Sequence, residues 1–161
     1  MTLGGDAQAL ESLPLKLIIV AMVATMSVVP AGEALDGMKT KVFLTEADLQ
    51  LDRMATAAQI VAIEGPGSSR TLDLDFSSDG RLAFAKIIIG DAEHGGCMSA
   101  VILELTNGAR LVRLIEDPPV WLRGPENSGL VVFTPEFELR MTLSVVNSTY
   151  CVVAEVVSWT S

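Results

Sequence analysis

The first pattern in the chain is an apolar block over residues 13–31, where Lys16 is the only charged residue. Because a helix rises about 1.5 Å per residue, a block of this length spans about 28 Å, close to the hydrocarbon thickness of a bilayer. Lys16 lies near one end, where its long aliphatic stem can carry the ammonium to the headgroups. The pattern predicts a hydrophobic anchor helix.

Two other interpretations of this block compete with a retained membrane or filament helix. A cleaved secretory signal peptide would explain Val29-Pro30-Ala31, which imitates a small-residue cleavage site. Against it, residues 1–12 contain Asp6 and Glu11 but no Lys or Arg, and the apolar run is longer than a typical signal-peptide core. A buried core helix fits poorly with so long a run that carries one charge. We therefore favour the retained helix.

Residues 32–64 have the pattern of a long amphipathic helix, because apolar residues recur mostly three to four positions apart between charged ones. Gly65-Pro66-Gly67 combines the strongest helix breakers and predicts where this helix ends. The helix is expected to continue the anchor helix, and residues 30–32 are where an interruption is expected if one occurs.

From Arg70 onward apolar and polar residues alternate, which predicts strands. Asp79-Gly80 and Asn107-Gly108 each join two such segments and predict hairpins, because the turn positions need φ > 0. We expect a third hairpin across Asn147-Ser148-Thr149, a short edge strand at residues 131–134 and a loop at residues 116–129. The strand-like segments are residues 71–76, 82–89, 100–105, 110–115, 137–146 and 150–159.

These elements predict an α+β fold, in which a long N-terminal hydrophobic and amphipathic helix precedes an antiparallel β-meander or a small β-sandwich. The expected parts are a short N-terminal segment at residues 1–12, the helix at residues 13–64, and a β domain at residues 70–161. We expect the β domain to lie outside the cytoplasm.

The net charge of the chain limits the kinds of molecule that it is expected to bind. The chain has 20 Asp and Glu against 11 Lys and Arg, which gives a net charge of −9. Neutralising phosphates requires clustered Lys and Arg, so nucleic acid is not an expected partner. The polybasic segment that would hold anionic lipid headgroups is missing from the sequence as well.

Cys97 and Cys151 are the two cysteines of the chain, and both fall in the β-rich part. An exported domain would allow them to form one disulfide, and two independent buried thiols are the alternative. Because neither cysteine belongs to a CxxC pair, a redox motif or a zinc site is not expected.

His94 is the single histidine of the chain, in a glycine-rich loop with two acids and Cys97. Such a set could bind a metal or pair a base with a thiol nucleophile. However, a conventional metal site would need a second histidine, and a lone histidine among acids and glycines is more typical of a solvated loop. Gly65-Pro66-Gly67 has no Lys and no following helix, so it is not a phosphate-binding loop.

Paired acids occur at Asp73 and Asp75 and at Glu136 and Glu138. At a spacing of two they share one face of a strand, which would suit a cation or a general acid–base pair. Alternation on any solvated sheet face produces the same spacing, and that interpretation is favoured. We predict no catalytic, cofactor or metal site, and hence no enzyme.

Two residues are candidates for surface roles. Trp121 lies between apolar neighbours in a proline-rich segment, either as an exposed contact residue for a partner or as a plug for the open end of a sheet. Asn147-Ser148-Thr149 fits the N-glycosylation pattern and lies in a predicted turn, where an acceptor would have to be. The acceptor Asn147 supports export of the β domain.

The segment LESLPLKLII at residues 10–19, the helix-to-sheet junction EGPGSSR at residues 64–70 and the order of the elements resemble type IV pilin-like proteins, most of all archaeal ones. In that family a glutamate five residues into the mature chain helps assembly, and the resemblance implies this role for Glu11, with cleavage after Asp6. The family usually cleaves after Gly or Ala behind a basic leader, whereas residues 1–6 are short and acidic. Gly4-Gly5 lies close but places Glu11 one position late.

The resemblance implies a structural subunit of an extracellular, type IV pilus-like filament that serves as an adhesive surface appendage. The implied partners are further copies of the chain, joined through N-terminal helices in the filament core, and the membrane that holds the precursor before assembly. A glycan on Asn147 would be displayed at the filament surface. The alternative is a single-span, membrane-anchored β-domain binding module that does not polymerise.

Overall fold

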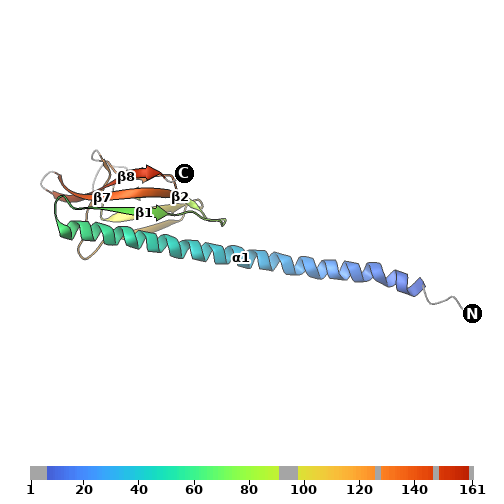
Figure 1. The fold of residues 1–161 in the computed structure, drawn as a ribbon. Coiled ribbons are helices and arrows are strands. Elements are labelled where there is room, and N and C mark those ends of the chain that lie inside the picture. The colour runs from blue at the N-terminus through green and yellow to red at the C-terminus, as the bar shows by residue number, and fades with distance from the viewer. Residues whose placement is uncertain (1–6, 91–97, 126–127, 147–148, 160–161) are drawn as a thin grey trace, which may run out of the picture. The chain divides into compact units, whose positions relative to one another are not determined.

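The computed structural model contains one helix, α1, and eight strands within the residues that it describes (Figure 1). Two compact units divide the chain, Met1–Lys39 and Thr40–Ser161, and α1 contributes residues to both. The backbone is described for residues 7–90, 98–125, 128–146 and 149–159, and side chains for residues 17–22, 33–90, 98–125, 128–145 and 149–159.

Helix α1 (Ala7–Glu64) ends where the sequence predicts, at the glycine that follows Glu64. Gly65 has φ of 95°, a left-handed conformation that a side chain with a Cβ adopts only at a cost. The Ser68 hydroxyl oxygen lies 2.7 Å from the carbonyl oxygens of both Val61 and Gly65, so its single hydrogen is shared between these two acceptors. These bonds satisfy carbonyl groups that the end of a helix leaves open.

Two four-stranded sheets follow the helix (Figure 1). The first sheet has the strand order β1-β7-β8-β5, and the second sheet has the order β4-β3-β2-β6. The β5–β8 pair is parallel, and the other pairs are antiparallel. The strands are β1 (Ser69–Asp75), β2 (Phe84–Ile89), β3 (Ala100–Leu105), β4 (Arg110–Leu114), β5 (Leu122–Arg123), β6 (Leu130–Val132), β7 (Glu136–Val146) and β8 (Thr149–Trp159).

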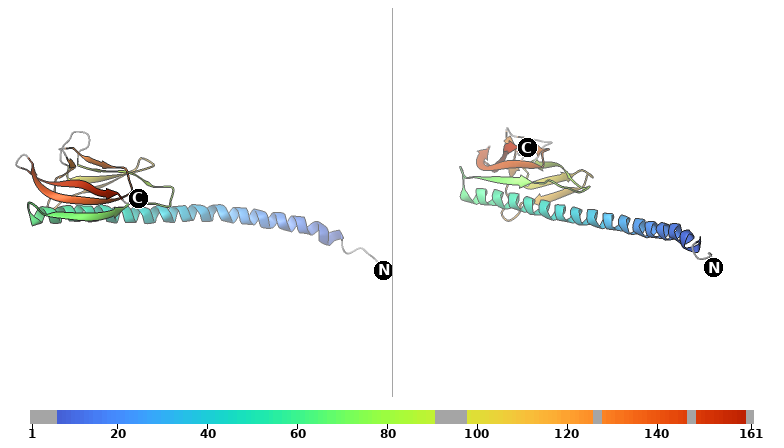
Figure 2. Two further views of the ribbon diagram at one scale, coloured as in Figure 1. Left: turned by 45° about the horizontal axis from the view of Figure 1, so that its top comes forward. Right: turned by 45° about the vertical axis from the view of Figure 1, so that its right-hand side comes forward.

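A single apolar core joins both sheets to the C-terminal part of α1. The helix contributes buried side chains spaced three to four residues apart, so they form one stripe along its surface. Both views in Figure 2 place the two sheets on the same side of this part of α1. The stripe consists of Phe43, Ala47, Leu51, Met54, Ala58 and Val61.

Contacts at both edges of the sheets show where α1 lies. From β4, the Arg113 guanidinium approaches the carboxylates of Asp48 at 2.6 Å and Asp52 at 3.1 Å. From β1, Arg70 forms an ion pair with Glu64 at the end of α1, at 2.7 Å. Since β1 and β4 are the edge strands of the two sheets, α1 closes the open side between them.

The prediction of a hydrophobic anchor helix is wrong. Within the residues that the structure describes, no helix is long and apolar enough to cross a membrane. From Glu33 onward, charged residues recur every few positions in α1 and separate its apolar residues. The expected interruption at residues 30–32 is not seen either, because α1 is assigned from Ala7 to Glu64.

Of the two arrangements expected for the β domain, the meander is wrong, because β1 and β2 do not form the hairpin predicted across Asp79-Gly80. Strand β1 pairs with β7, and β2 pairs with β3 and β6 in the other sheet. The segment between β1 and β2 therefore carries the chain from one sheet to the other. Residues 116–129, expected to be a loop, contain β5, which adds an edge to the first sheet.

The other two hairpins are confirmed. Strands β3 and β4 pair across Asn107-Gly108, with Gly108 at φ of 80°, as the turn type requires. Strands β7 and β8 pair from Val146 opposite Thr149 to Phe137 opposite Trp159. The predicted edge strand near residues 131–134 is found as β6, which borders the second sheet.

Two leucines of the same helix test the packing of α1 against the sheets. Leu51 is 1% exposed in the core, whereas Leu49 is 60% exposed. We expect Leu51→Ala to lower the free energy of unfolding by about 2–5 kcal/mol, because it leaves a cavity in a packed core. Leu49→Ala should change it by less than about 0.5 kcal/mol. Urea denaturation of both variants checks this, and equal losses would contradict the packing described.

Candidate functional site

The N-terminal unit exposes large apolar side chains on α1. Leu17, Ile18, Ile19 and Val20 are each between 52% and 66% exposed. Successive residues on a helix are rotated by about 100°, so these four side chains point to different sides of α1. A helix that is apolar on all sides is normally buried, and a contiguous exposed apolar surface marks an interaction site.

Glu11 lies six residues before Leu17 in α1, and its side chain is outside the described residues. Residues 1–6, where the leader is expected, are also outside them. The assembly role of Glu11 and the cleavage after Asp6 therefore stay predictions from the resemblance.

A groove of about 610 Å³ runs between α1 and β1 in the second unit. Its apolar lining comes from Leu49 and Ile60 of the helix and Leu72 of the strand. Arg53 and Arg70 line it as well. Because β1 is an edge strand, this groove borders a sheet edge, a place where other chains commonly dock. We call this feature the α1–β1 groove.

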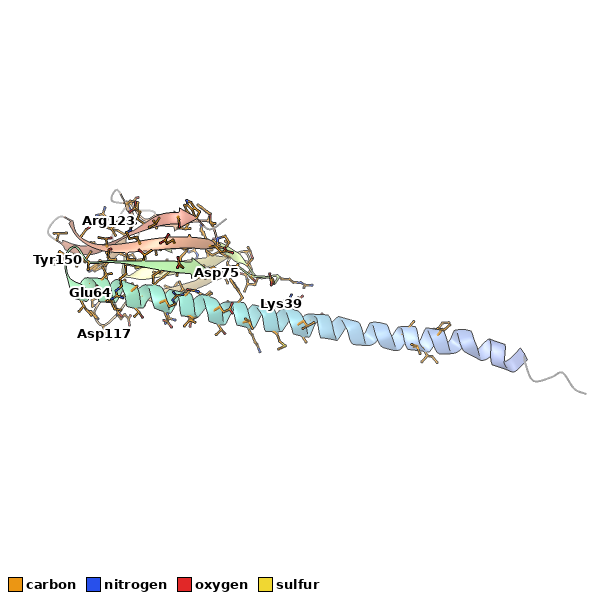
Figure 3. All side chains as sticks on the ribbon, viewed as in Figure 1. Lys39, Glu64, Asp75, Asp117, Arg123 and Tyr150 are labelled. Carbon is orange, nitrogen blue, oxygen red and sulfur yellow. The ribbon has the colours of Figure 1, made fainter. Side chains whose placement is uncertain are left out.

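A smaller pocket of about 300 Å³ lies at the end of the domain where α1 stops. Two aromatic side chains line it, Trp121 at 47% exposure and Tyr150 at 60% exposure. In Figure 3 Tyr150 lies at the same end of the domain as Glu64 and away from Asp75. Pro66, Pro119 and Leu143 complete an uncharged lining together with Ala62, Gly65 and Val120.

The exposure of Trp121 follows from its two neighbours. Val120 and Leu122 are buried, so the residue between them in an extended segment points to solvent. The Trp121 carbonyl accepts a hydrogen bond from the Val152 N–H at 2.8 Å, which fixes this segment against β8. Trp121 is thus held with its side chain partly exposed at the surface.

The two acidic pairs lie together, which the sequence did not predict. In the β1–β7 register, Asp73 lies opposite Glu138 and Asp75 opposite Glu136. Like charges opposite each other are unfavourable. The Ser158 hydroxyl donates a hydrogen bond to Glu138 at 2.7 Å, and Asp75 accepts one from the Ser77 N–H at 2.8 Å. Among the described residues, no group of three or more His, Cys, Asp or Glu is arranged to hold a metal ion.

Several predicted site residues lie outside the described residues, namely His94, Cys97 and Asn147. Cys151 is described, and it is 2% exposed in β8 opposite Ser144. The disulfide and the glycosylation site therefore stay predictions.

A second apolar surface, which the sequence did not lead us to expect, lies on the outer side of the second sheet. Val112 and Leu114 of β4 are 55% and 56% exposed, and Phe133, just after β6, is 70% exposed. A pattern that could have revealed it is Ile87-Ile88-Ile89, because consecutive apolar residues in a strand make both of its faces apolar.

The predicted disulfide has a direct test. We expect the unreduced, denatured chain to resist alkylation at Cys97 and Cys151, and reduction to expose both thiols, as read by peptide mass spectrometry. Loss of a native disulfide from a small exported domain typically costs about 2–5 kcal/mol, so Cys97→Ser should lower the free energy of unfolding by that amount. Alkylation of both cysteines without reductant would show two independent thiols instead.

Comparisons with protein-family models, with curated protein sequences and with solved structures give no match to this chain. Three features of the chain itself bear on its function: the exposed apolar segment of α1, the α1–β1 groove, and the pocket lined by Trp121 and Tyr150, which we call the aromatic pocket.

Proposed function

We propose that this chain is a structural subunit of an extracellular filament of the type IV pilus-like kind, assembled through the N-terminal parts of its helices. In this arrangement helices from several copies pack together in the filament core. The β domains of the copies form the outer surface.

The observation that carries the proposal is the exposure of Leu17, Ile18, Ile19 and Val20 on successive sides of α1. Burying one such side chain contributes about 1.5–3 kcal/mol, so leaving all of them in water is costly. A single flat partner would cover one side of the helix. A bundle of copies covers every side, which is why an assembly with helices at its centre fits this segment.

In the second unit, the C-terminal part of α1 packs into the core of the β domain. The apolar core takes its helix members from Phe43 to Val61 and its remaining members from the two sheets and their connections. Residues 17–20 are not members of this core. Their apolar character therefore calls for a role other than packing the β domain.

The aromatic pocket favours a second candidate function. Trp121 and Tyr150 are exposed beside an uncharged hollow, and aromatic residues are enriched where proteins bind partners. A β-domain binding module that does not polymerise would use this pocket as its main site. In a filament subunit the same pocket would serve adhesion.

One substitution in the apolar segment tests the proposal. We expect wild-type cells to shed filaments that contain this chain, as seen by electron microscopy of sheared surface material. Ile19→Lys should abolish them, because an unpaired ammonium in an apolar bundle costs several kcal/mol. The control Ser77→Lys places the same charge on an exposed loop residue and should leave filaments intact.

The processing prediction is tested on the same material. N-terminal sequencing of the filament subunit should find a chain that starts near Ala7, and Glu11→Ala should reduce the number of filaments. A wild-type chain that is intact, never found in filaments and present as a small oligomer would contradict the proposal. It would favour the binding module instead.

A further inference from the structure

The α1–β1 groove has the size and composition of a small-molecule site. Its volume of about 610 Å³ falls within the range of about 300–1,000 Å³ that is usual for such sites. It also combines an apolar lining with a few polar side chains, as such sites do. The apolar part comes from Leu49, Ala57 and Ile60 of α1 and from Leu72 of β1.

The helix side of the groove is a straight row of side chains. Leu49, Arg53, Thr56 and Ile60 are spaced three to four residues apart, so they lie along one side of α1. From Arg53 to Ile60 the helix rises about 10 Å. A lining of this shape suits an extended aliphatic chain of medium length, because such a chain touches apolar side chains along the row.

Two of the three charged groups that line the groove already have a partner of opposite charge. The Asp52 carboxylate pairs with a guanidinium of β4 at 3.1 Å, and Arg70 pairs with Glu64 at 2.7 Å. The third is Arg53. Within the described residues, its guanidinium bonds to the neutral amide oxygen of Gln50 at 2.8 Å and to no carboxylate. The groove thus has one cation that an anionic ligand can pair with.

The donors at the groove match a carboxylate. The bond from Arg53 to Gln50 uses Nη1, which leaves Nη2 and Nε to donate in the fork arrangement that a carboxylate accepts through both oxygens. Thr56 and Thr71 line the groove as well, and among the described residues neither hydroxyl has a hydrogen-bond partner. Unused donors beside an apolar lining call for a ligand with an anionic end and an apolar body.

We propose that the α1–β1 groove binds a fatty carboxylate, with the carboxylate at Arg53 and the aliphatic chain along Ala57, Ile60 and Leu72. Removal of the chain from water supplies an attraction without direction. The charge-assisted hydrogen bonds from Arg53 fix which end of the ligand lies where. The proposal goes beyond the filament and does not depend on it, because residues 17–20 are not part of the groove.

Other occupants satisfy the groove less well. An inorganic anion would leave the apolar side chains in water, and a neutral hydrocarbon would leave Arg53 without a carboxylate. A further strand would pair with the edge of β1 that faces away from β7. Figures 1 and 2 show β1 between β7 and α1, so the helix lies where that strand would pair.

Photolabelling of the full chain tests the proposal. The probe is a decanoate with a diazirine in its chain, used below the concentration at which it forms micelles, and the labelled residues are mapped by mass spectrometry. We expect labels within residues 49–72 that unlabelled decanoate displaces. Decanol, which has no charge, and acetate, which has no aliphatic chain, should each be at least about tenfold weaker competitors.

A matched pair of variants tests the role of the charge. Arg53→Gln should lower the labelling of residues 49–72 at least about tenfold, because it removes the charge-assisted bonds. Arg140→Gln removes the same charge from an exposed residue of β7 outside the groove, and it should leave the labelling unchanged. Circular dichroism and thermal unfolding of the two variants must match.

A second pair tests the apolar part of the groove. Thr56→Trp places a bulky ring in the groove and should also lower the labelling at least about tenfold, because the ring takes the space of the aliphatic chain. Ser77→Trp places the same ring on an exposed loop residue and should have no effect.

Three results would overturn the proposal. They are labels confined to residues outside 49–72, equal labelling of the Arg53→Gln and Arg140→Gln chains, and equal displacement by decanol and decanoate. The last of these would show an apolar groove that does not recognise a carboxylate. None of them bears on the filament proposal, which electron microscopy of surface material tests separately.

Discussion

The fold of the β domain depends on one contact, the insertion of the apolar stripe of α1 between the edge strands of two sheets. Met54, Ala58 and Val61 are fully buried there, although they belong to a helix with charged residues on its remaining surface. Without these side chains the core between the sheets would open to water along β1 and β4. The helix is thus part of the β domain and not a tether attached to it.

That constraint fixes which residues of α1 remain for other roles. Rotation of about 100° per residue means that a stripe turned to the sheets leaves the opposite side outward. Val42 and Leu49 lie on that outward side and are 56% and 60% exposed. Leu49 then forms part of the α1–β1 groove, so the same packing that completes the core also shapes this groove.

Turn chemistry in the sequence predicted two of the three hairpins correctly, but the hairpin expected across Asp79-Gly80 was wrong. Asn107-Gly108 joins neighbours in one sheet, whereas Asp79-Gly80 lies where the chain passes between sheets. The partner of Leu72 is Leu139, far along the chain, and no local pattern records such a pairing. Strand β5 has two residues, too few for alternation to be visible. The breakers Gly65-Pro66-Gly67 predicted the helix end and periodicity predicted most strands, whereas the pairing of the strands required the packed structure.

In the proposed filament, the segment with Leu17, Ile18 and Ile19 would drive association, because these exposed apolar side chains gain most from burial. The core of the β domain is completed by the stripe from Phe43 to Val61 on the same helix, and residues 17–20 are not part of that core. One helix would thus serve two purposes along its length: its C-terminal part completes the β domain, and its N-terminal part would hold the contacts between copies.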